Sequence, residues 1–122
     1  MIAEFTAHIE SLCAANNITI EWGGTGRAWK KSRKIRTPEI KSEITYAIAL
    51  HEIGHILGKM QDGYRLEKEV GAWLWAKDNA IIWNKPMIKT LKHRLTSYLK
   101  WCKRRRGVWV PPANHIAWSL AA

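Results

Sequence analysis

The sequence predicts a small α+β domain. Apolar residues recur at the helical period in four segments of the chain, whereas residues 18–22 alternate and are rich in β-branched side chains. A chain of 122 residues fits one domain, and a hydrophobic fraction of 47% supplies a core without disulfides. We therefore expect a single domain over residues 1–106, with residues 107–122 packed on it as an irregular C-terminal arm.

The first 40 residues are expected to form a helix and a small sheet. Residues 2–15 carry one apolar stripe at helical spacing, and the alternating segment 18–22 is typical of a strand. The glycines of residues 23–26 mark a turn. Residues 27–40 are basic and partly extended, and Pro38 indicates that a strand here lies at the edge of the sheet or ends there.

Three further helices are predicted over residues 43–57, from Leu66 to about Trp83, and from Met87 to about Cys102. Ser42 is a suitable N-cap for the first of them, and Gly58 is expected to end it. Residues 61–63 form a turn between the first and the second of these helices.

The helix over residues 43–57 contains the sequence His51-Glu52-Ile53-Gly54-His55. Residues four apart lie one turn above each other on a helix, so His51 and His55 can hold one metal ion at about 2.0–2.1 Å each. Glu52 lies at the rim of the same face, where its carboxylate can accept a proton from a metal-bound water. This HExxH spacing predicts a catalytic Zn²⁺ site with Glu52 as its general base.

A catalytic zinc ion usually takes three protein ligands and one water, so a third ligand is required. Glu69 is the first candidate, because Glu69 and His55 are equally far along the chain from Asp62 at the centre of the turn. Glu69 also falls on an apolar stripe, where an unpaired carboxylate is costly. Asp62 is the second candidate, whereas Gln61 is a poor zinc ligand.

The segment ALHEIGHILG at residues 49–58, followed by EVGAWLWA at residues 69–76, resembles the ImmA/IrrE-type metallopeptidases of phages, plasmids and bacteria. The resemblance covers residues 44–76 and implies a minimal zincin-like, gluzincin-type domain with a glutamate ligand on the helix after HExxH. Trp75 stands where that family has an aromatic residue. The sequence departs from the family in the short interval between the two motifs and in Trp73, which replaces an asparagine.

Motif and resemblance together predict a zinc-dependent metallopeptidase that hydrolyses a cytosolic protein or peptide, such as a phage-related one. In the implied mechanism, Glu52 takes a proton from a zinc-bound water and returns it to the leaving amine. Zincins usually hold an extended peptide along an edge strand, for which residues 33–38 are the candidate. Tyr64, His93 and His115 stay open as candidates for stabilising the oxyanion.

The chain has a formal net charge of +10, which favours anionic partners. Basic clusters at residues 30–34 and 103–106 lie near Trp29 and Trp101, a pattern that suits single-stranded nucleic acid, although a solvated basic face explains it more simply. The alternative function is a non-catalytic, zinc-stabilised module that binds nucleic acid or an acidic protein. Glu52 favours the enzyme, because structural zinc sites are normally closed by four ligands.

Cys13 and Cys102 lie far apart and show no CxxC spacing, which indicates reduced thiols in a cytosolic protein. No apolar run approaches the roughly 18 residues of a membrane span. The N-terminus also lacks the pattern of a signal peptide. We therefore expect a cytoplasmic protein with no membrane partner.

Overall fold

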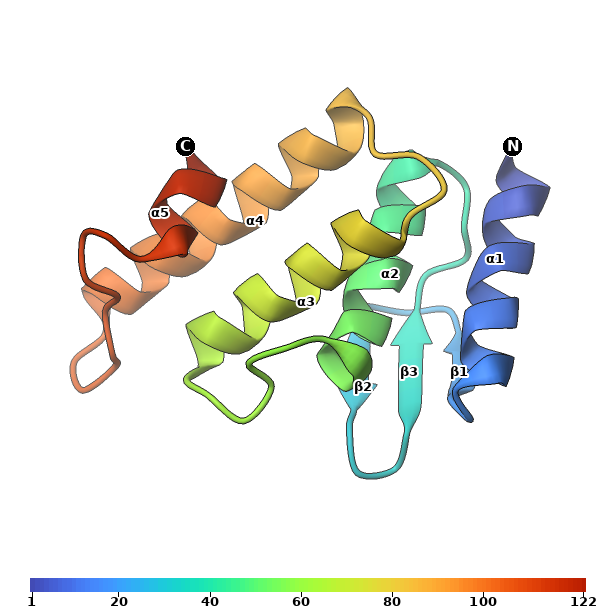
Figure 1. Cartoon of the computed structure of the whole chain (residues 1–122), viewed down its shortest axis with the longest axis horizontal. Coiled ribbons are helices and arrows are strands. Elements are labelled where there is room, and N and C mark those ends of the chain that lie inside the picture. The colour runs from blue at the N-terminus through green and yellow to red at the C-terminus, as the bar shows by residue number, and fades with distance from the viewer.

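The computed structural model describes all 122 residues and confirms the α+β class, with five helices and one three-stranded sheet (Figure 1). The helices are α1 (Ile2–Ala15), α2 (Glu43–Leu57), α3 (Arg65–Asn79), α4 (Lys85–Arg104) and α5 (Ile116–Ala121). The strands are β1 (Thr19–Trp22), β2 (Arg27–Trp29) and β3 (Lys34–Thr37).

The sheet has the order β1–β3–β2, so β3 is its central strand. β1 pairs with β3 in parallel and β2 pairs with it antiparallel. The expectation that residues 33–38 hold a peptide as an edge strand is therefore wrong, whereas the alternative for Pro38, that the strand ends there, is confirmed. The strand ends at Thr37, so Pro38 lies just beyond the ladder, where its missing amide hydrogen costs nothing.

The edge strand beside α2 is β2, which the sequence did not separate from the basic segment. A short turn joins β2 to β3, and within it Arg33 takes a positive φ of 50°. The Arg33 guanidinium donates two hydrogen bonds to the carbonyl oxygen of Asn16, at 3.1 and 2.6 Å. Arg33 therefore ties the hairpin to the end of α1 and is not a free cation of the basic cluster.

The two faces of the sheet differ in their exposure to solvent. Ile35 and Thr37 are fully buried on the face that α1 and α2 cover. Arg27 pairs with Arg36, and Trp29 pairs with Lys34, so these four side chains share the opposite face. No helix covers that face, and it stays open to solvent.

α2 begins at the N-cap Ser42, whose side chain accepts a hydrogen bond from the Thr45 amide while Thr45 bonds back to the Ser42 amide. The helix ends at Gly58 as expected, but the Gly58 backbone is extended, with φ at −75°. Glycine is needed at position 58 for a different reason, because a Cβ there would clash with the carbonyl groups of Gly54 and Gly71. The glycines at 54, 58 and 71 thus let α2 and α3 pack backbone against backbone.

α3 ends at Asn79, four residues before the expected end at Trp83. The Ile81 amide instead donates a hydrogen bond of 2.9 Å to the hydroxyl of the buried Tyr46. This bond to α2 draws the chain out of the helix, and α4 then starts with Pro86 in its first turn.

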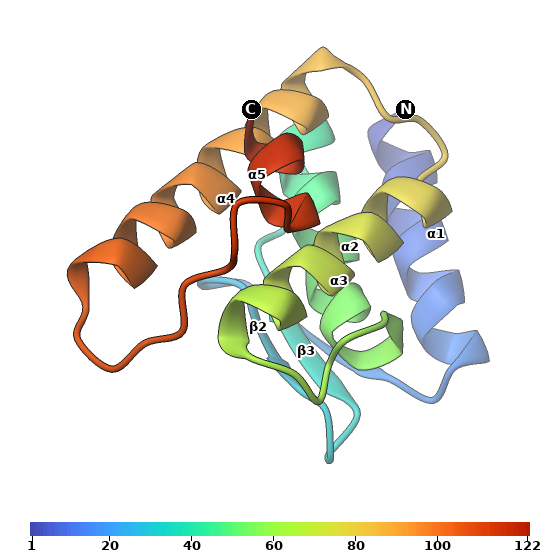
Figure 2. The same ribbon diagram turned by 60° about the vertical axis from the view of Figure 1, so that its left-hand side comes forward.

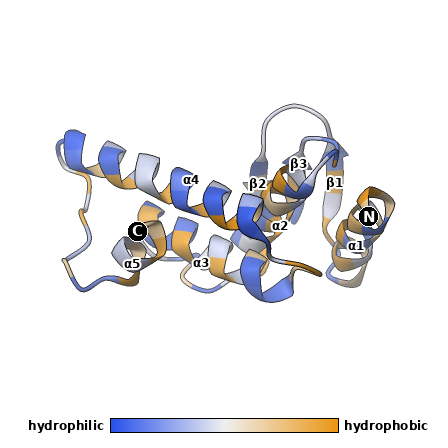
Figure 3. Cartoon of the chain, turned by 90° about the horizontal axis from the view of Figure 1, so that it is seen from above, coloured by the Kyte–Doolittle hydropathy of each residue, from blue (hydrophilic) through white to orange (hydrophobic).

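α4 lies against α2 and α3 with its hydrophobic side and turns its hydrophilic side outwards (Figure 3). The C-terminal arm is not wholly irregular, because it contains α5, which packs alongside α4 in both views (Figures 1 and 2). Ala117 of α5 is fully buried in the same apolar core as Phe5 of α1. No helix combines the length and the apolar composition that a membrane crossing needs.

Candidate metal centre

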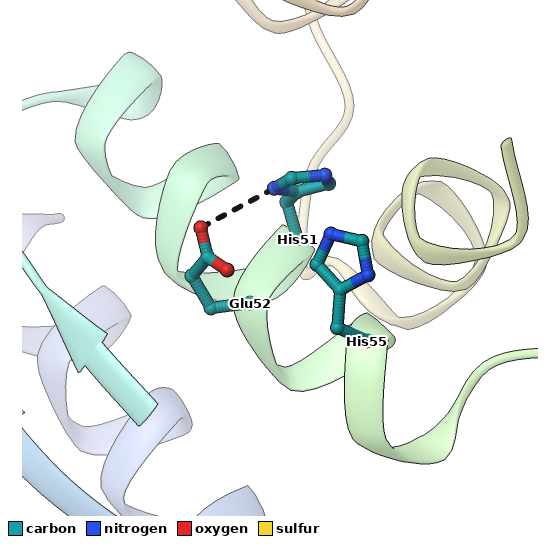
Figure 4. Close-up of side chains that lie close together, drawn as sticks. All are labelled: His51, Glu52 and His55. Carbon is teal, nitrogen blue, oxygen red and sulfur yellow. Dashed lines mark ion pairs between the residues drawn. The ribbon is translucent and has the colours of Figure 1, made fainter. Parts of the chain in front are cut away.

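α2 presents His51 and His55 one turn apart, with ring centroids separated by 4.5 Å. Figure 4 shows both imidazoles projecting from the same side of the helix, with Glu52 beside His51. His51 is only 4% exposed and stacks on Trp73 of α3, with ring centroids 4.2 Å apart. The helical spacing therefore brings together the two nitrogen donors of the HExxH motif, and Trp73 holds the first ring in place.

α3 contributes Glu69 to the same point. Its Oε2 lies 2.7 Å from Nε2 of His51 and 2.8 Å from Nε2 of His55. Glu69 therefore lies opposite His55 across the turn, as its spacing along the chain predicted. Asp62, the second candidate for a third ligand, is on the surface instead, where it is 98% exposed and pairs with Lys30 at 3.3 Å.

The two carboxylates favour positive charge next to His51. Burial lowers the pKa of His51, but hydrogen bonding and charge attraction from Glu52 and Glu69 outweigh burial and raise that pKa to about 9. Burial raises the pKa of Glu69, and hydrogen bonds from His51 and His55 more than offset this and hold it well below its ordinary value. The same two carboxylates would also attract a metal cation, which has to displace the proton from His51 in order to bind its nitrogen.

Glu52 is almost fully buried, at 5% exposure. Its Oε2 lies 3.5 Å from Nδ1 of His51 (Figure 4), and no other group bonds to that nitrogen. Gly26, which immediately precedes β2, packs directly on this carboxylate, because a Cβ on Gly26 would overlap Oε2 of Glu52. The start of the edge strand therefore forms one wall around the expected general base.

Gln61 orients His55, a role that the sequence did not reveal. Its Oε1 accepts a hydrogen bond of 3.1 Å from Nδ1 of His55. Its Nε2 donates two hydrogen bonds of 2.9 Å each to the carbonyl groups of Lys59 and Lys68, which settles the orientation of the amide. Nδ1 of His55 therefore carries a proton, which leaves Nε2, 2.8 Å from Oε2 of Glu69, as the nitrogen that a metal ion would bind.

Two adjoining cavities, of about 510 and 740 Å³, meet at the site, because His51 and Glu69 line both. The smaller one is bounded by Gly26 and the start of β2. The larger one runs along α4 and is bounded by Trp101. The candidate centre thus lies at the middle of a cleft between the edge strand and α4.

Of the three residues considered for the oxyanion, His93 alone lines this cleft. Tyr64 stacks on Trp109, with ring centroids 4.5 Å apart, and lies outside both cavities. His115 caps α5 and lies 3.8 Å from Glu67, also outside both.

Tyr98 of α4 lines both cavities together with His51 and Glu69. Burial raises the pKa of its phenol, so the hydroxyl group stays protonated and able to donate a hydrogen bond. Its signal in the sequence is a hydroxyl group among the apolar residues of α4.

The ligand atoms of His51, Glu52 and His55 all lie within 4.8 Å of one another, so this group can hold a metal ion. Glu69 is a better third ligand than Glu52, because Glu69 meets the two Nε2 atoms, whereas Glu52 faces Nδ1 of His51. Two imidazole nitrogens and one carboxylate oxygen form a donor set that suits zinc and neighbouring divalent metals.

No known protein family, curated protein or solved structure matches the chain. The resemblance of residues 44–76 to the ImmA/IrrE-type metallopeptidases therefore rests on the motif residues alone.

Proposed function

We propose that the protein is a zinc-dependent metallopeptidase that hydrolyses peptide bonds of a cytosolic protein. The observation that carries this proposal is the convergence of Nε2 of His51, Nε2 of His55 and Oε2 of Glu69, at 2.7 and 2.8 Å, beside the buried carboxylate of Glu52. The first three residues would hold the zinc ion and leave a fourth position open to the cleft. Zinc bound there supplies Lewis-acid activation of a water molecule and of the scissile carbonyl.

Glu52 is the general base in this proposal. Its carboxylate accepts the proton of the attacking water and returns it to the leaving amine. Tyr98 is the preferred donor to the oxyanion, because it lines both cavities and its hydroxyl group stays protonated. β2 borders the smaller cavity with its unpaired edge, so an extended substrate segment can add to the sheet and pass over the site.

The test combines metal content with peptide hydrolysis. We expect one zinc ion per chain in the wild type, a sharp loss in His55→Ala and Glu69→Ala, and no loss in Asp62→Ala, the matched surface control. Glu52→Gln should keep zinc and lose hydrolysis of a peptide mixture, and Tyr98→Phe should slow hydrolysis by roughly 100-fold. Zinc retained in Glu69→Ala would exclude Glu69 as a ligand, and no metal uptake in the wild type would refute the proposal.

A second candidate is the non-catalytic binding module, and Trp29 favours it. The cationic groups of Arg27, Lys34 and Arg36 lie 5.0, 5.2 and 5.7 Å from the Trp29 ring on the open face of the sheet. Basic groups around an aromatic ring suit a single-stranded nucleic acid. Salt-dependent oligonucleotide binding that is lost in Trp29→Ala, in a protein without peptidase activity, would support this function over the first.

A further inference from the structure

The cleft around the candidate metal centre has a strong excess of positive charge. The basic residues that line it are Arg27, Lys30, Arg65, Lys68, Arg94 and Arg105, of which Arg27 turns its guanidinium group to Trp29 on the open face of the sheet. The only carboxylates that line it are Glu52 and Glu69, which belong to the centre itself. Lys30 pairs with Asp62, whereas the other five cations have no carboxylate partner within ion-pair distance.

Two of these cations are held in place along the wall of the larger cavity. The guanidinium carbons of Arg65 and Arg105 each lie 5.3 Å from the ring of Trp101. Cation–π contact orients a guanidinium group but leaves its N–H groups free to form bidentate hydrogen bonds with a carboxylate. Arg65 and Arg94 line both cavities, so each lies close to the point where the scissile bond would be.

We propose that the substrate is an acidic peptide segment whose Asp or Glu side chains, on both sides of the scissile bond, pair with the cations of this cleft. This inference rests on the proposed peptidase function. Arg65 and Arg94 bind the carboxylates nearest the bond, and Lys68 in the smaller cavity and Arg105 in the larger one bind those that lie further away. The positive cleft also concentrates acidic chains at the site and speeds their capture.

The cleft suits a peptide better than a nucleic acid. Of its two tryptophans, Trp73 is 1% exposed and stacks on the imidazole of His51. The ring nearest the centre therefore offers no indole face on which a base can stack. The unpaired edge of β2 beside the smaller cavity offers backbone hydrogen bonds, which an extended peptide can use.

The experiment uses two fluorescent peptide mixtures of equal length. One carries Asp and Glu at half of its positions, and the other carries Asn and Gln at the same positions. Binding is measured by anisotropy on the zinc-loaded Glu52→Gln protein, and cleavage is measured on the zinc-loaded wild type. Arg94→Glu is compared with Lys92→Glu, which makes the same charge change on an exposed residue of α4 outside the cleft.

We expect the acidic mixture to bind roughly tenfold or more tightly than the neutral one and to be cleaved faster, with a preference that falls as salt rises. Arg94→Glu should remove most of this preference, and Lys92→Glu should keep it.

Cleavage of both mixtures at equal rates would overturn the inference and leave the peptidase function standing. Acidic binding without cleavage would refute the peptidase function while supporting the acidic ligand. A single-stranded oligonucleotide that displaces the acidic peptides at equal concentration would replace the inference with nucleic-acid binding.

Discussion

Gly26 controls the position of Glu52. The Gly26 backbone is not left-handed, so alanine brings no backbone strain there, but its Cβ would overlap the Glu52 carboxylate. Because the overlapping atom is the end of a flexible side chain, Gly26→Ala should displace the carboxylate at little cost in stability. We expect peptidase activity to fall by roughly 100-fold, with zinc content and melting temperature unchanged. Thr25→Ala, next to it and exposed, is the control, and full activity in Gly26→Ala would show that Glu52 works from another position.

Gln61 positions a metal ligand without touching the metal. Gln61→Ala removes the acceptor for Nδ1 of His55, so the ring loses both its fixed orientation and its tautomer. Zinc affinity should fall by roughly 10- to 100-fold, measured by competition with a zinc-binding dye. Lys59→Ala should have no such effect, because Lys59 contributes only its backbone carbonyl. Equal zinc affinity in the two variants would show that Gln61 only braces the turn.

At the scale of elements, the close contact between α2 and α3 brings the donors of the site together. A Cβ on Gly54 would overlap the Ala72 carbonyl oxygen and lie 2.9 Å from the Ala72 Cα, so α3 must move to admit alanine. In an unconstrained helix, Gly→Ala stabilises by about 1 kcal/mol. Here we expect Gly54→Ala to lower the free energy of unfolding by about 1–3 kcal/mol in a denaturant titration, and to weaken zinc binding, because α3 carries Glu69. A higher free energy of unfolding in Gly54→Ala would show that α2 and α3 can move apart without a loss of packing energy.

The strand order is another property of elements, and it changed the assignment of the substrate edge. The pattern of residues 33–38 is compatible with an edge or with a central strand, because Pro38 restricts only the point at which pairing stops. Pairing of β3 with both β1 and β2 settles the order and leaves β2 as the edge beside the site. Hydrogen bonds between strands join residues that are distant in the chain. The sequence of residues 33–38 therefore does not reveal which strands pair with it.

At the scale of the whole molecule, the two thiols report on the cooperativity of the fold. Cys13 of α1 and Cys102 of α4 are each 1% exposed and belong to the same apolar core. Burial raises the pKa of Cys13 to about 11 and also raises that of Cys102, so both thiols are protonated at pH 8. We expect neither to react with a thiol-specific chromophore in the native protein, and both to react at one common rate as denaturant promotes global unfolding.

Single variants Cys13→Ser and Cys102→Ser separate the two reactions. If Cys102 reacts earlier than Cys13, then α4 and α5 open as a unit of their own. That result would contradict a single cooperative domain. It would place the boundary between two separately unfolding units within the cleft.

The sequence alone determined the α+β class, the positions of α1 and α2, and the three residues His51, Glu52 and His55 at the centre of the candidate site. These are local properties, since a helix places residues four apart on one face whatever surrounds it. Glu69 was within reach as well, because a short turn between two helices constrains which residues face each other.

The tertiary structure decided the rest. It placed Gly26 on Glu52 and Gln61 on His55, brought Tyr98 into the cleft, and left Tyr64 and His115 outside it. Each of these contacts joins parts of the chain that no helical or strand period connects. The balance of charge in the cleft is decided in the same way, because a net charge of +10 does not say where the cations gather until β2, α3 and α4 have packed around the site.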